Sequence, residues 1–308
     1  MNEDQLVKAI EAAARRLPPV RLGIGDDAAL VDVREGCELA VCVDTLNEGV
    51  HFPADVAPAD LGHKALAVNL SDLAAMGADP AWALLSLSLQ QVEERWLGQF
   101  LDGFCDLAER FRVALAGGDS TKGPLAVSVT VAGYVQPEQA LLRGAGRAGD
   151  HLWVSGTLGD AAAALGGCPD EFLDARLHRP EPRVALGQAL RGLATSCIDL
   201  SDGLRRDLPR LLPSGRGAQV DVFALPRSEA LRAAADDRRT LSWAMVGGDD
   251  YELCFTAAPE HGDAVRDAGR RARVTVTRIG MVTRDSELRW LDRHGQPFEP
   301  ESAGFEHF

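Results

Sequence analysis

Aspartates in unusual settings are the residues of this 308-residue chain most able to do chemistry. They recur in short segments flanked by glycine or serine within otherwise apolar sequence, whereas solvated aspartates usually sit among other polar residues. The acids of this kind are Asp26, Asp27, Asp44, Asp72, Asp119, Asp199, Asp202, Asp249 and Asp250. Two carboxylates about 4 Å apart repel by roughly 4 kcal/mol at an effective dielectric near 20, so converging acids need protonation, an arginine or a divalent cation.

Among cations, Mg²⁺ suits this pattern best, because hard oxygen ligands without a cluster of His and Cys favour it over zinc. Protein-bound Mg²⁺ keeps waters and takes other ligands from phosphate oxygens, so the pattern indicates a phosphate substrate. Each acid taken alone could instead cap a helix or a turn. That simpler interpretation weakens when all the acids are considered together.

Glycine-containing turns and a few basic residues are further candidates for binding phosphate. Gly118 is one of several glycines that would let a backbone N–H approach an anion closely. The segment Ser155–Asp160 opens an expected helix, where it could seat a phosphate or serve only as a helix cap. Arg143 is a candidate phosphate ligand, with a solvated loop charge as the ordinary alternative. The sequence contains no P-loop motif.

Composition excludes several classes of protein. The chain has 46 acidic and 32 basic residues and a formal charge of −14, which argues against a nucleic-acid partner. No apolar run approaches the ~18 residues of a membrane span. The first 17 residues place acids before basics, as in an amphipathic helix and unlike a signal peptide, so a cytoplasmic protein is expected. The six scattered cysteines favour free thiols over a zinc or disulfide framework.

Strand and helix patterns alternate irregularly, which favours an α+β (mixed α/β) fold. A segment rich in glycine and arginine between Pro137 and Asp150 marks a boundary between domains 1–140 and 141–308. Strands are expected at 28–33, 39–44, 82–89, 113–116, 125–135, 151–154, 196–199, 218–223, 252–256 and 274–281. Helices are expected at 1–17, 59–76, 93–111, 160–165, 183–193, 202–212 and 263–271.

The expected strands and helices indicate where several of these aspartates lie. Asp44 and Asp199 each follow a short apolar strand, so both carboxylates are expected at strand ends beside turns. Asn69 and Asp72 are three residues apart on the helix expected over 59–76, among apolar neighbours. That helix therefore buries a polar pair.

Taken in order, six motifs and the closing residues resemble the thiamine-monophosphate kinase family. The match runs over nearly the whole chain, from about Leu22 to Phe308. The motifs are GIGDDAA from Gly23, DTL from Asp44 with GVHF from Gly49, KALAVNLSDLAAMGADP from Lys64, GGDST from Gly117, IDLSDG from Ile198, GGDDYEL from Gly247, and the terminal GFEHF.

The resemblance implies two α/β domains of the kind found in aminoimidazole ribonucleotide synthetase, with dimerisation through the N-terminal domain and ATP held by several Mg²⁺ ions. It implies transfer of the ATP γ-phosphoryl group to thiamine monophosphate, giving thiamine diphosphate. The implied metal ligands are Asp27, Asp44, Asp72, Asp119, Asp199 and Asp202. The implied nucleotide contacts are Gly118, Asp119, Arg143 and Ser201, and the implied contacts to thiamine monophosphate are His51, Asp249 and Phe305.

The chain departs from the family pattern at two places. Family members commonly carry hydroxyl residues just before the aspartate of the DTL motif, where this chain has Cys42 and Val43. A metal ligand supplied by those hydroxyls would have to become a backbone carbonyl or a water. The family's GGED motif is GGDD here, so the Asp249 side chain is one methylene shorter.

The implied acceptor is a phosphate monoester that is largely ionised near neutral pH, so direct in-line transfer needs no general base. Catalysis would then consist of positioning and charge neutralisation. Two alternatives remain at this stage: another ATP-dependent synthetase of the same superfamily, and a non-enzymatic acidic protein that binds cations. The match around Asp44–Phe52 and Gly247–Leu253 favours the kinase over the synthetases.

Overall fold

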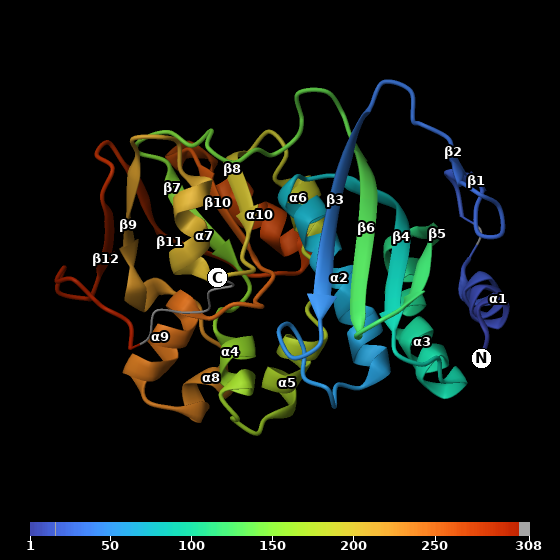
Figure 1. The fold of residues 1–308 in the computed structure, drawn as a ribbon. Coiled ribbons are helices and arrows are strands. Elements are labelled where there is room, and N and C mark those ends of the chain that lie inside the picture. Colours follow the sequence, from blue (N-terminus) through green and yellow to red (C-terminus); the bar gives the residue numbers. More distant parts are fainter. Residues whose placement is uncertain (16, 302–308) are drawn as a thin grey trace. The chain divides into compact units, whose positions relative to one another are not determined.

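The computed structural model describes residues 1–15 and 17–301, which form two compact units (Figure 1). Unit 1 comprises Met1–Leu73 and Ala78–Glu138. Unit 2 comprises Ala74–Gly77 and the described residues from Gln139 onward. Both units combine helices with a sheet, which confirms the expected mixed α/β class.

Unit 1 is built on a four-stranded sheet in the order β3-β6-β4-β5. Its members are β3 (Glu38–Asn47), β4 (Asp79–Leu89), β5 (Ala114–Lys122) and β6 (Ala126–Val135), with a separate small ribbon of β1 (Val20–Leu22) and β2 (Leu30–Val31). β6 runs antiparallel to β3 and β4, while β4 and β5 are parallel. Alternation of buried and half-buried residues along β4 follows from one face packing against helices.

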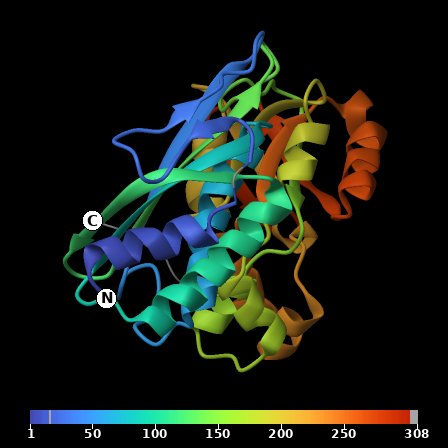
Figure 2. The ribbon, with the colours of Figure 1, turned by 90° about the vertical axis from the view of Figure 1, so that its right-hand side faces the viewer.

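Unit 1 contains α1 (Glu3–Ala13), α3 (Glu94–Phe111) and all but the last two residues of α2 (Pro58–Ala75). α2 and α3 approach each other closely at two glycines, since a Cβ at Gly62 would lie 2.0 Å from the Phe100 carbonyl oxygen and one at Gly103 would lie 1.8 Å from that of Ala59. α1 runs beside α3 (Figure 2). α2 ends as expected before Gly77, whose N–H donates to the Ala74 carbonyl.

Unit 2 is built on a six-stranded sheet in the order β12-β9-β11-β7-β10-β8, antiparallel except for the β12–β9 pair. The strands are β7 (His151–Ser155), β8 (Ala194–Asp199), β9 (Gly217–Asp221), β10 (Leu253–Ala257), β11 (Val276–Thr283) and β12 (Leu288–Leu291). The helices are α4 (Asp160–Leu165), α5 (Glu171–His178), α6 (Val184–Ala189), α7 (Leu204–Leu211), η1 (Val222–Ala224), α8 (Glu229–Ala234), α9 (Asp237–Val246), η2 (Pro259–His261) and α10 (Gly262–Ala272).

The main core of unit 2 lies on one face of this sheet. Leu152 and Val154 of β7 pack there against Leu204 and Leu208 of α7 and Leu241 of α9. Because side chains alternate along a strand, His151 and Trp153 face the other side, where α10 begins.

Two of the strands that carry candidate site residues differ from the sequence expectation. β3 continues past Asp44 to Asn47, because β6 pairs with it through Ala126. β5 runs through Gly118 and Asp119, where a turn was expected, because these residues pair with Leu85 and Ser86 of β4. Asp44 and Asp119 therefore lie within strands, while Asp199 ends β8 as expected.

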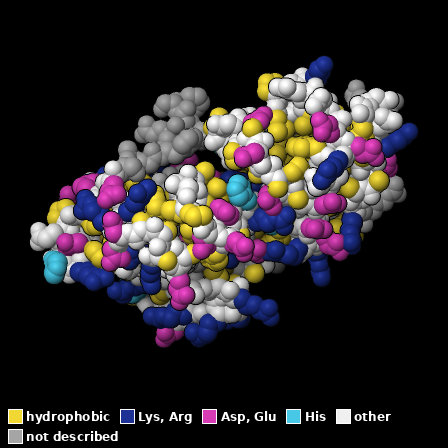
Figure 3. All heavy atoms as spheres, turned by 90° about the horizontal axis from the view of Figure 1, so that it is seen from below, with side chains coloured by type: hydrophobic (Ala, Val, Ile, Leu, Met, Phe, Trp, Pro, Cys, Tyr) yellow, Lys and Arg dark blue, Asp and Glu magenta, His cyan; other side chains and the backbone are white. Residues whose placement is uncertain are grey.

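The surplus of acidic residues does not produce a surface of uniform sign. On the face drawn in Figure 3, acidic and basic side chains are interspersed. No helix in the described part of the chain is long and apolar enough to cross a membrane.

Candidate active site

In unit 2, the DLSDG and GGDDYE motifs lie side by side. The Asp249 backbone N–H donates to the Ser201 carbonyl at 2.9 Å, and the Tyr251 N–H donates to the Leu200 carbonyl at 2.8 Å. Asp199 precedes this contact at the end of β8 and is 5% exposed. Three of the residues expected from the sequence, Asp199, Ser201 and Asp249, are thus brought together at one end of β8 and β10.

The GGDDYE loop has an uncommon backbone. Asp249 and Tyr251 have φ angles of 64° and 49°, in the left-handed region that a bulky residue such as tyrosine rarely occupies. The Tyr251 hydroxyl donates to Asp249 Oδ1 at 3.0 Å, which orients the Asp249 carboxylate. Such backbone strain costs on the order of 1–3 kcal/mol per residue and concentrates at functional sites.

The buried acidic side chains of Asp250 and Glu252 hold the GGDDYE loop in place. Both Asp250 oxygens accept a hydrogen bond from the Gly159 N–H, at 2.9 and 3.1 Å, and burial raises the pKa of Asp250 well above its ordinary value. The Asp250 carboxyl group therefore occupies the start of α4. Of the two roles open to Ser155–Asp160, phosphate seat and cap, the structure favours the cap, since a protein carboxyl group already takes the Gly159 N–H.

Glu252 is the second anchor and lies in a cradle of donors. Arg183 donates from Nε to Oε2 at 2.7 Å and from Nη2 to Oε1 at 2.5 Å. Arg176 Nη2 donates to Oε1 at 2.9 Å, and the Ser155 hydroxyl donates to Oε2 at 2.5 Å. Burial alone would raise the pKa of Glu252, but Arg183 and Arg176 more than offset it and hold the pKa below its ordinary value.

Replacing Glu252 by Gln should lower the free energy of unfolding by about 3–5 kcal/mol. Arg183 would lose the Glu252 carboxylate, and Arg176 would keep the longer contact to Asp160. Urea denaturation measures this loss. The matched control is Glu287→Gln, which removes an exposed partner of Arg289 that water already screens and should change little. Equal stability of the two variants would contradict the anchoring role of Glu252.

In unit 1, α2 supports the strand that carries Asp44. The Asp44 N–H donates to Asn69 Oδ1 at 3.0 Å, and Asn69 is fully buried. The Cys42 thiol donates to the Asn69 carbonyl at 3.5 Å, so Cys42 faces α2 and Asp44, two residues along, shares that face. Burial raises the pKa of Asp44, and His51 opposes the shift. Asp72 lies one turn beyond Asn69 and is half-buried.

Asp119 lies at the other edge of the same sheet. β6 and β4 separate β3 from β5, which is roughly 14 Å at the usual spacing of neighbouring strands. If Asp44 and Asp119 both bind metal, one ion cannot serve both. Asp27 is exposed in a turn, where its N–H donates to the Asp26 carboxylate at 2.8 Å.

His51 follows β3 and is held by two contacts. Its Nδ1 accepts from the Asn47 N–H at 3.0 Å, and the buried Lys64 ammonium donates to its carbonyl at 3.4 Å. A neutral His51 therefore carries its proton on Nε2.

Asp202 and Arg143 differ in their surroundings. Arg210 Nη1 lies 3.0 Å from the Asp202 carboxylate and Arg206 Nε lies 3.5 Å from it, so arginine competes with any metal there. Arg143 is exposed. Phe305 lies outside the described residues.

No group of three or more His, Cys, Asp or Glu side chains converges as a metal centre within residues 1–15 and 17–301. The candidate aspartates are hard oxygen donors, and no more than two His, Cys, Asp or Glu side chains gather at one point that could hold a metal ion in the described residues. That arrangement suits Mg²⁺, which binds through one or two carboxylates and completes its shell with waters and substrate phosphates. The residues present therefore fit this ion.

Sequence reasoning missed the cradle around Glu252. Glu252 itself adjoins the GGDD motif and precedes the apolar strand β10, which is a usable signal for a buried acid. Arg176 and Arg183 carry no such signal, because arginines are common in the sequence around them.

Comparisons with known proteins agree with this fold. The model for the AIR synthase related protein N-terminal domain matches residues 25–135, and that for the C-terminal domain matches residues 147–291. The chain is therefore an AIR synthase related protein. It is 45% identical over 300 residues to thiamine-monophosphate kinase of Escherichia coli, covering 94% of this chain and 92% of that one. The chain belongs to the thiamine-monophosphate kinase family.

Two solved structures support the assignment. Thiamine-monophosphate kinase from Stenotrophomonas maltophilia superposes with a TM-score of 0.89 at 45% identity, covering 96% of this chain and 98% of that one. A structure described as AaThiL complexed with AMPPCP and TMP has a TM-score of 0.77 at 30% identity, covering 99% and 95% of the two chains. The family resemblance stated from the motifs is confirmed.

Proposed function

We propose that the chain transfers the γ-phosphoryl group of ATP to thiamine monophosphate by direct in-line transfer, giving thiamine diphosphate. Family membership makes it a phosphotransferase with a phosphate group as acceptor. The observation that carries the proposal is the 45% identity to thiamine-monophosphate kinases over nearly the full chain. A relative with 30% identity holds the ATP analogue AMPPCP together with TMP. The reaction is proposed to take place in the cytoplasm, as expected from the sequence.

The proposed Mg²⁺ ligands are Asp27, Asp44, Asp72, Asp119, Asp199 and Asp202. Bound Mg²⁺ would neutralise phosphate charge during transfer. Gly118, Asp119, Arg143 and Ser201 are the proposed nucleotide contacts, and His51, Asp249 and Phe305 are the proposed contacts to thiamine monophosphate. The N-terminal domain, 1–140, would then bind ATP and Mg²⁺ and form the dimer, while 141–308 supplies the remaining nucleotide and substrate contacts.

Each of these side chains binds or orients in the proposed reaction, and none acts as a general base, because the acceptor oxygen is already ionised. Because His51 Nδ1 accepts from the Asn47 N–H, a hydrogen bond from the His51 ring to a substrate oxygen would come from Nε2–H. Asp249 is held by Tyr251 and by the Ser201 carbonyl, so its shorter side chain starts from a fixed position. Preorganisation of this kind lowers the entropic cost of the transition state.

A product assay tests the proposed function. The purified protein with ATP, MgCl₂ and thiamine monophosphate should form thiamine diphosphate, resolved by liquid chromatography, and excess EDTA should abolish the product. A nucleotide titration with and without Mg²⁺ separates the kinase from a cation-binding protein that ignores ATP. Absence of thiamine diphosphate with a well-folded protein would overturn the proposal.

The proposed homodimer is supported by the uncovered face of the unit 1 sheet. Leu39, Val41 and Val43 of β3 are 42%, 54% and 60% exposed, on the face opposite α2. Exposed apolar residues gathered in this way mark interaction surfaces. Their position on an outer strand matches a dimer formed by sheet pairing.

Replacing Val41 by Lys should therefore raise the dimer dissociation constant by about 100-fold or more, since a charge would enter an apolar interface. Light scattering measures the mass, expected near twice 32.9 kDa for the parent protein. Val33→Lys is the control, because Val33 is 70% exposed outside the sheet. An unchanged dimer in the Val41 variant would exclude this face.

A further inference from the structure

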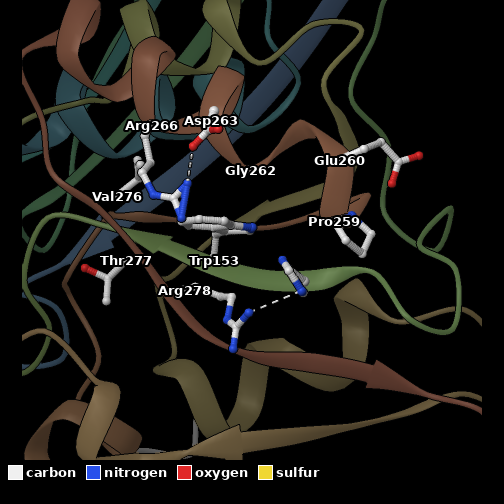
Figure 4. Close-up of a pocket in the computed structure, with 10 residues that line it drawn as sticks. Trp153, Pro259, Glu260, Gly262, Asp263, Arg266, Val276, Thr277 and Arg278 are labelled. Carbon is white, nitrogen blue, oxygen red and sulfur yellow. Dashed lines mark hydrogen bonds and ion pairs between the residues drawn. The ribbon is translucent and has the colours of Figure 1, made fainter.

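A cavity of about 540 Å³ lies in unit 2, on the face of the sheet opposite the core formed with α7 and α9 (Figure 4). Side chains from β7, β11 and the start of α10 line it. None of its lining residues is a proposed metal, nucleotide or thiamine contact. Its volume falls in the range of small-molecule sites.

The floor of this cavity contains a buried donor with no acceptor. Trp153 is 2% exposed, and its Nε1 has no hydrogen-bond partner among the described residues. In Figure 4 the indole nitrogen points toward the end of the cavity where Pro259 and Glu260 lie. Buried indole N–H groups usually find a partner, because an unsatisfied buried donor costs free energy. The missing partner is an acceptor atom.

Two arginines line the cavity. Arg278 makes one polar contact, to His151 Nε2 at 3.3 Å, and no carboxylate lies within 4.0 Å of its side chain in the described part of the chain. The Arg266 guanidinium lies over the Trp153 ring, 5.4 Å from its centroid. Partial burial, together with Arg278 and Arg266, lowers the pKa of His151.

The start of α10 lies at the same place, where the Gly262 N–H already donates to the Pro259 carbonyl of the preceding turn η2. Gly262 and Asp263 open this helix of 11 residues and line the cavity. The His261 side chain makes no capping hydrogen bond there and instead contacts the Leu193 carbonyl through Nδ1 at 3.1 Å. The contribution of this helix start to anion binding is therefore limited to its dipole.

Two acidic residues, Glu260 and Asp263, also line the cavity and oppose the charge of the arginines. Asp263 is paired with Arg266 at 2.8 Å and its side chain is 99% exposed, so its charge is offset and directed to solvent. Glu260 forms no ion pair within the described residues. Against these acids stand Arg278, which pairs with no carboxylate within the described residues, and the Trp153 N–H, which has no acceptor there.

We propose that this cavity is a second ligand site, which takes a small organic anion through an oxyanion group, phosphate or carboxylate. The oxyanion accepts a hydrogen bond from Trp153 Nε1 and pairs with Arg278 of β11. The rest of the ligand occupies the remaining volume of the cavity. The site is independent of the kinase proposal, because it uses none of the same residues.

The full chain labelled with ¹⁵N tests this site without ATP or Mg²⁺. The chain has five tryptophans, and Trp153→Phe identifies the Trp153 indole N–H resonance. Inorganic phosphate and succinate are titrated separately at a mildly alkaline pH, where both are largely dianionic, and at constant ionic strength. We expect saturable movement of that resonance with one of them, with a dissociation constant on the order of millimolar, and the responding anion identifies the oxyanion.

Two variants complete the test. Arg278→Met should weaken the apparent affinity at least about 10-fold, because a charge-assisted hydrogen bond is lost, while the kinase activity stays unchanged. Arg271→Met is the control, since Arg271 is exposed on α10 but does not line the cavity, and it should bind like the parent protein. An unmoved Trp153 resonance with both anions, a linear response shared with chloride, or equal affinity of the two variants would overturn the proposal.

Discussion

Replacing Asp72 by Asn should reduce kcat for phosphorylation of thiamine monophosphate by about 10³-fold or more, while the protein keeps its fold. Asn has nearly the shape of Asp but lacks the charge that holds a divalent cation and balances the phosphates. A 10³-fold loss corresponds to about 4 kcal/mol of transition-state stabilisation, a magnitude typical for removal of one electrostatic contact. Initial rates at saturating ATP measure the effect.

The position of Asp72 explains why the fold should survive. Asp72 is half-buried on α2, one turn beyond the buried Asn69, and the core side of that helix is provided by leucines such as Leu66 and Leu70. Thermal unfolding should therefore change little. Asp106→Asn, on the exposed side of α3, is the control and should keep full activity.

The Mg²⁺ dependence gives the Asp72 prediction its specificity. Loss of one ligand should raise the Mg²⁺ concentration at which the residual activity is half-maximal, since the ion would then be held by fewer carboxylates. Near-normal turnover in the variant, or a large loss with an unchanged Mg²⁺ requirement, would contradict the role of Asp72 as a metal ligand.

The long elements of unit 1 could be predicted from local sequence. The helix expected over 59–76 is found at Pro58–Ala75, because its apolar residues and the terminal Gly77 are signals carried within the segment itself. The strand expected over 82–89 is found within β4 for the same reason. Patterns of this kind need no knowledge of distant residues.

Elements defined by pairing or by tertiary burial could not be predicted in this way. β3 and β5 extend as far as their partner strands allow, and nothing within Gly117–Asp119 reveals the neighbouring β4. The helix α9 was missed because burial from Thr240 to Val246 is nearly continuous, which leaves no amphipathic stripe. Its N-cap, Asp236, was the available signal.

For the site, the sequence motifs suggested candidate residues but not their contacts. The hydrogen bond from Asp249 to the Ser201 carbonyl joins residues far apart in the chain, as does the contact of Asp44 with Asn69. The positive φ of Asp249 depends on the loop closing around buried groups, so a residue-by-residue preference cannot give it.

Replacing Gly118 by Ala should lower the free energy of unfolding by about 3–5 kcal/mol, among the largest effects expected for a single residue. An added Cβ would lie 1.7 Å from the Leu85 carbonyl oxygen and 2.6 Å from its carbon. Both are backbone atoms of β4, paired with β5 at this point, so relief requires the strands to separate. Because Asp119 follows directly, kinase activity should fall with stability.

Gly98→Ala on α3 is the matched control for Gly118→Ala. No heavy atom lies within 4 Å of a Cβ placed at Gly98, and α3 is a regular helix there. Alanine should therefore raise the free energy of unfolding by about 0.5–1 kcal/mol, through its higher helix propensity and the reduced entropy of the unfolded chain. Urea denaturation of both variants measures the difference. We expect the two changes in the free energy of unfolding to have opposite signs, because the added methyl group meets open space at Gly98 and a paired strand at Gly118. Equal stabilities of the two variants would show that the β4–β5 pairing does not require glycine at position 118.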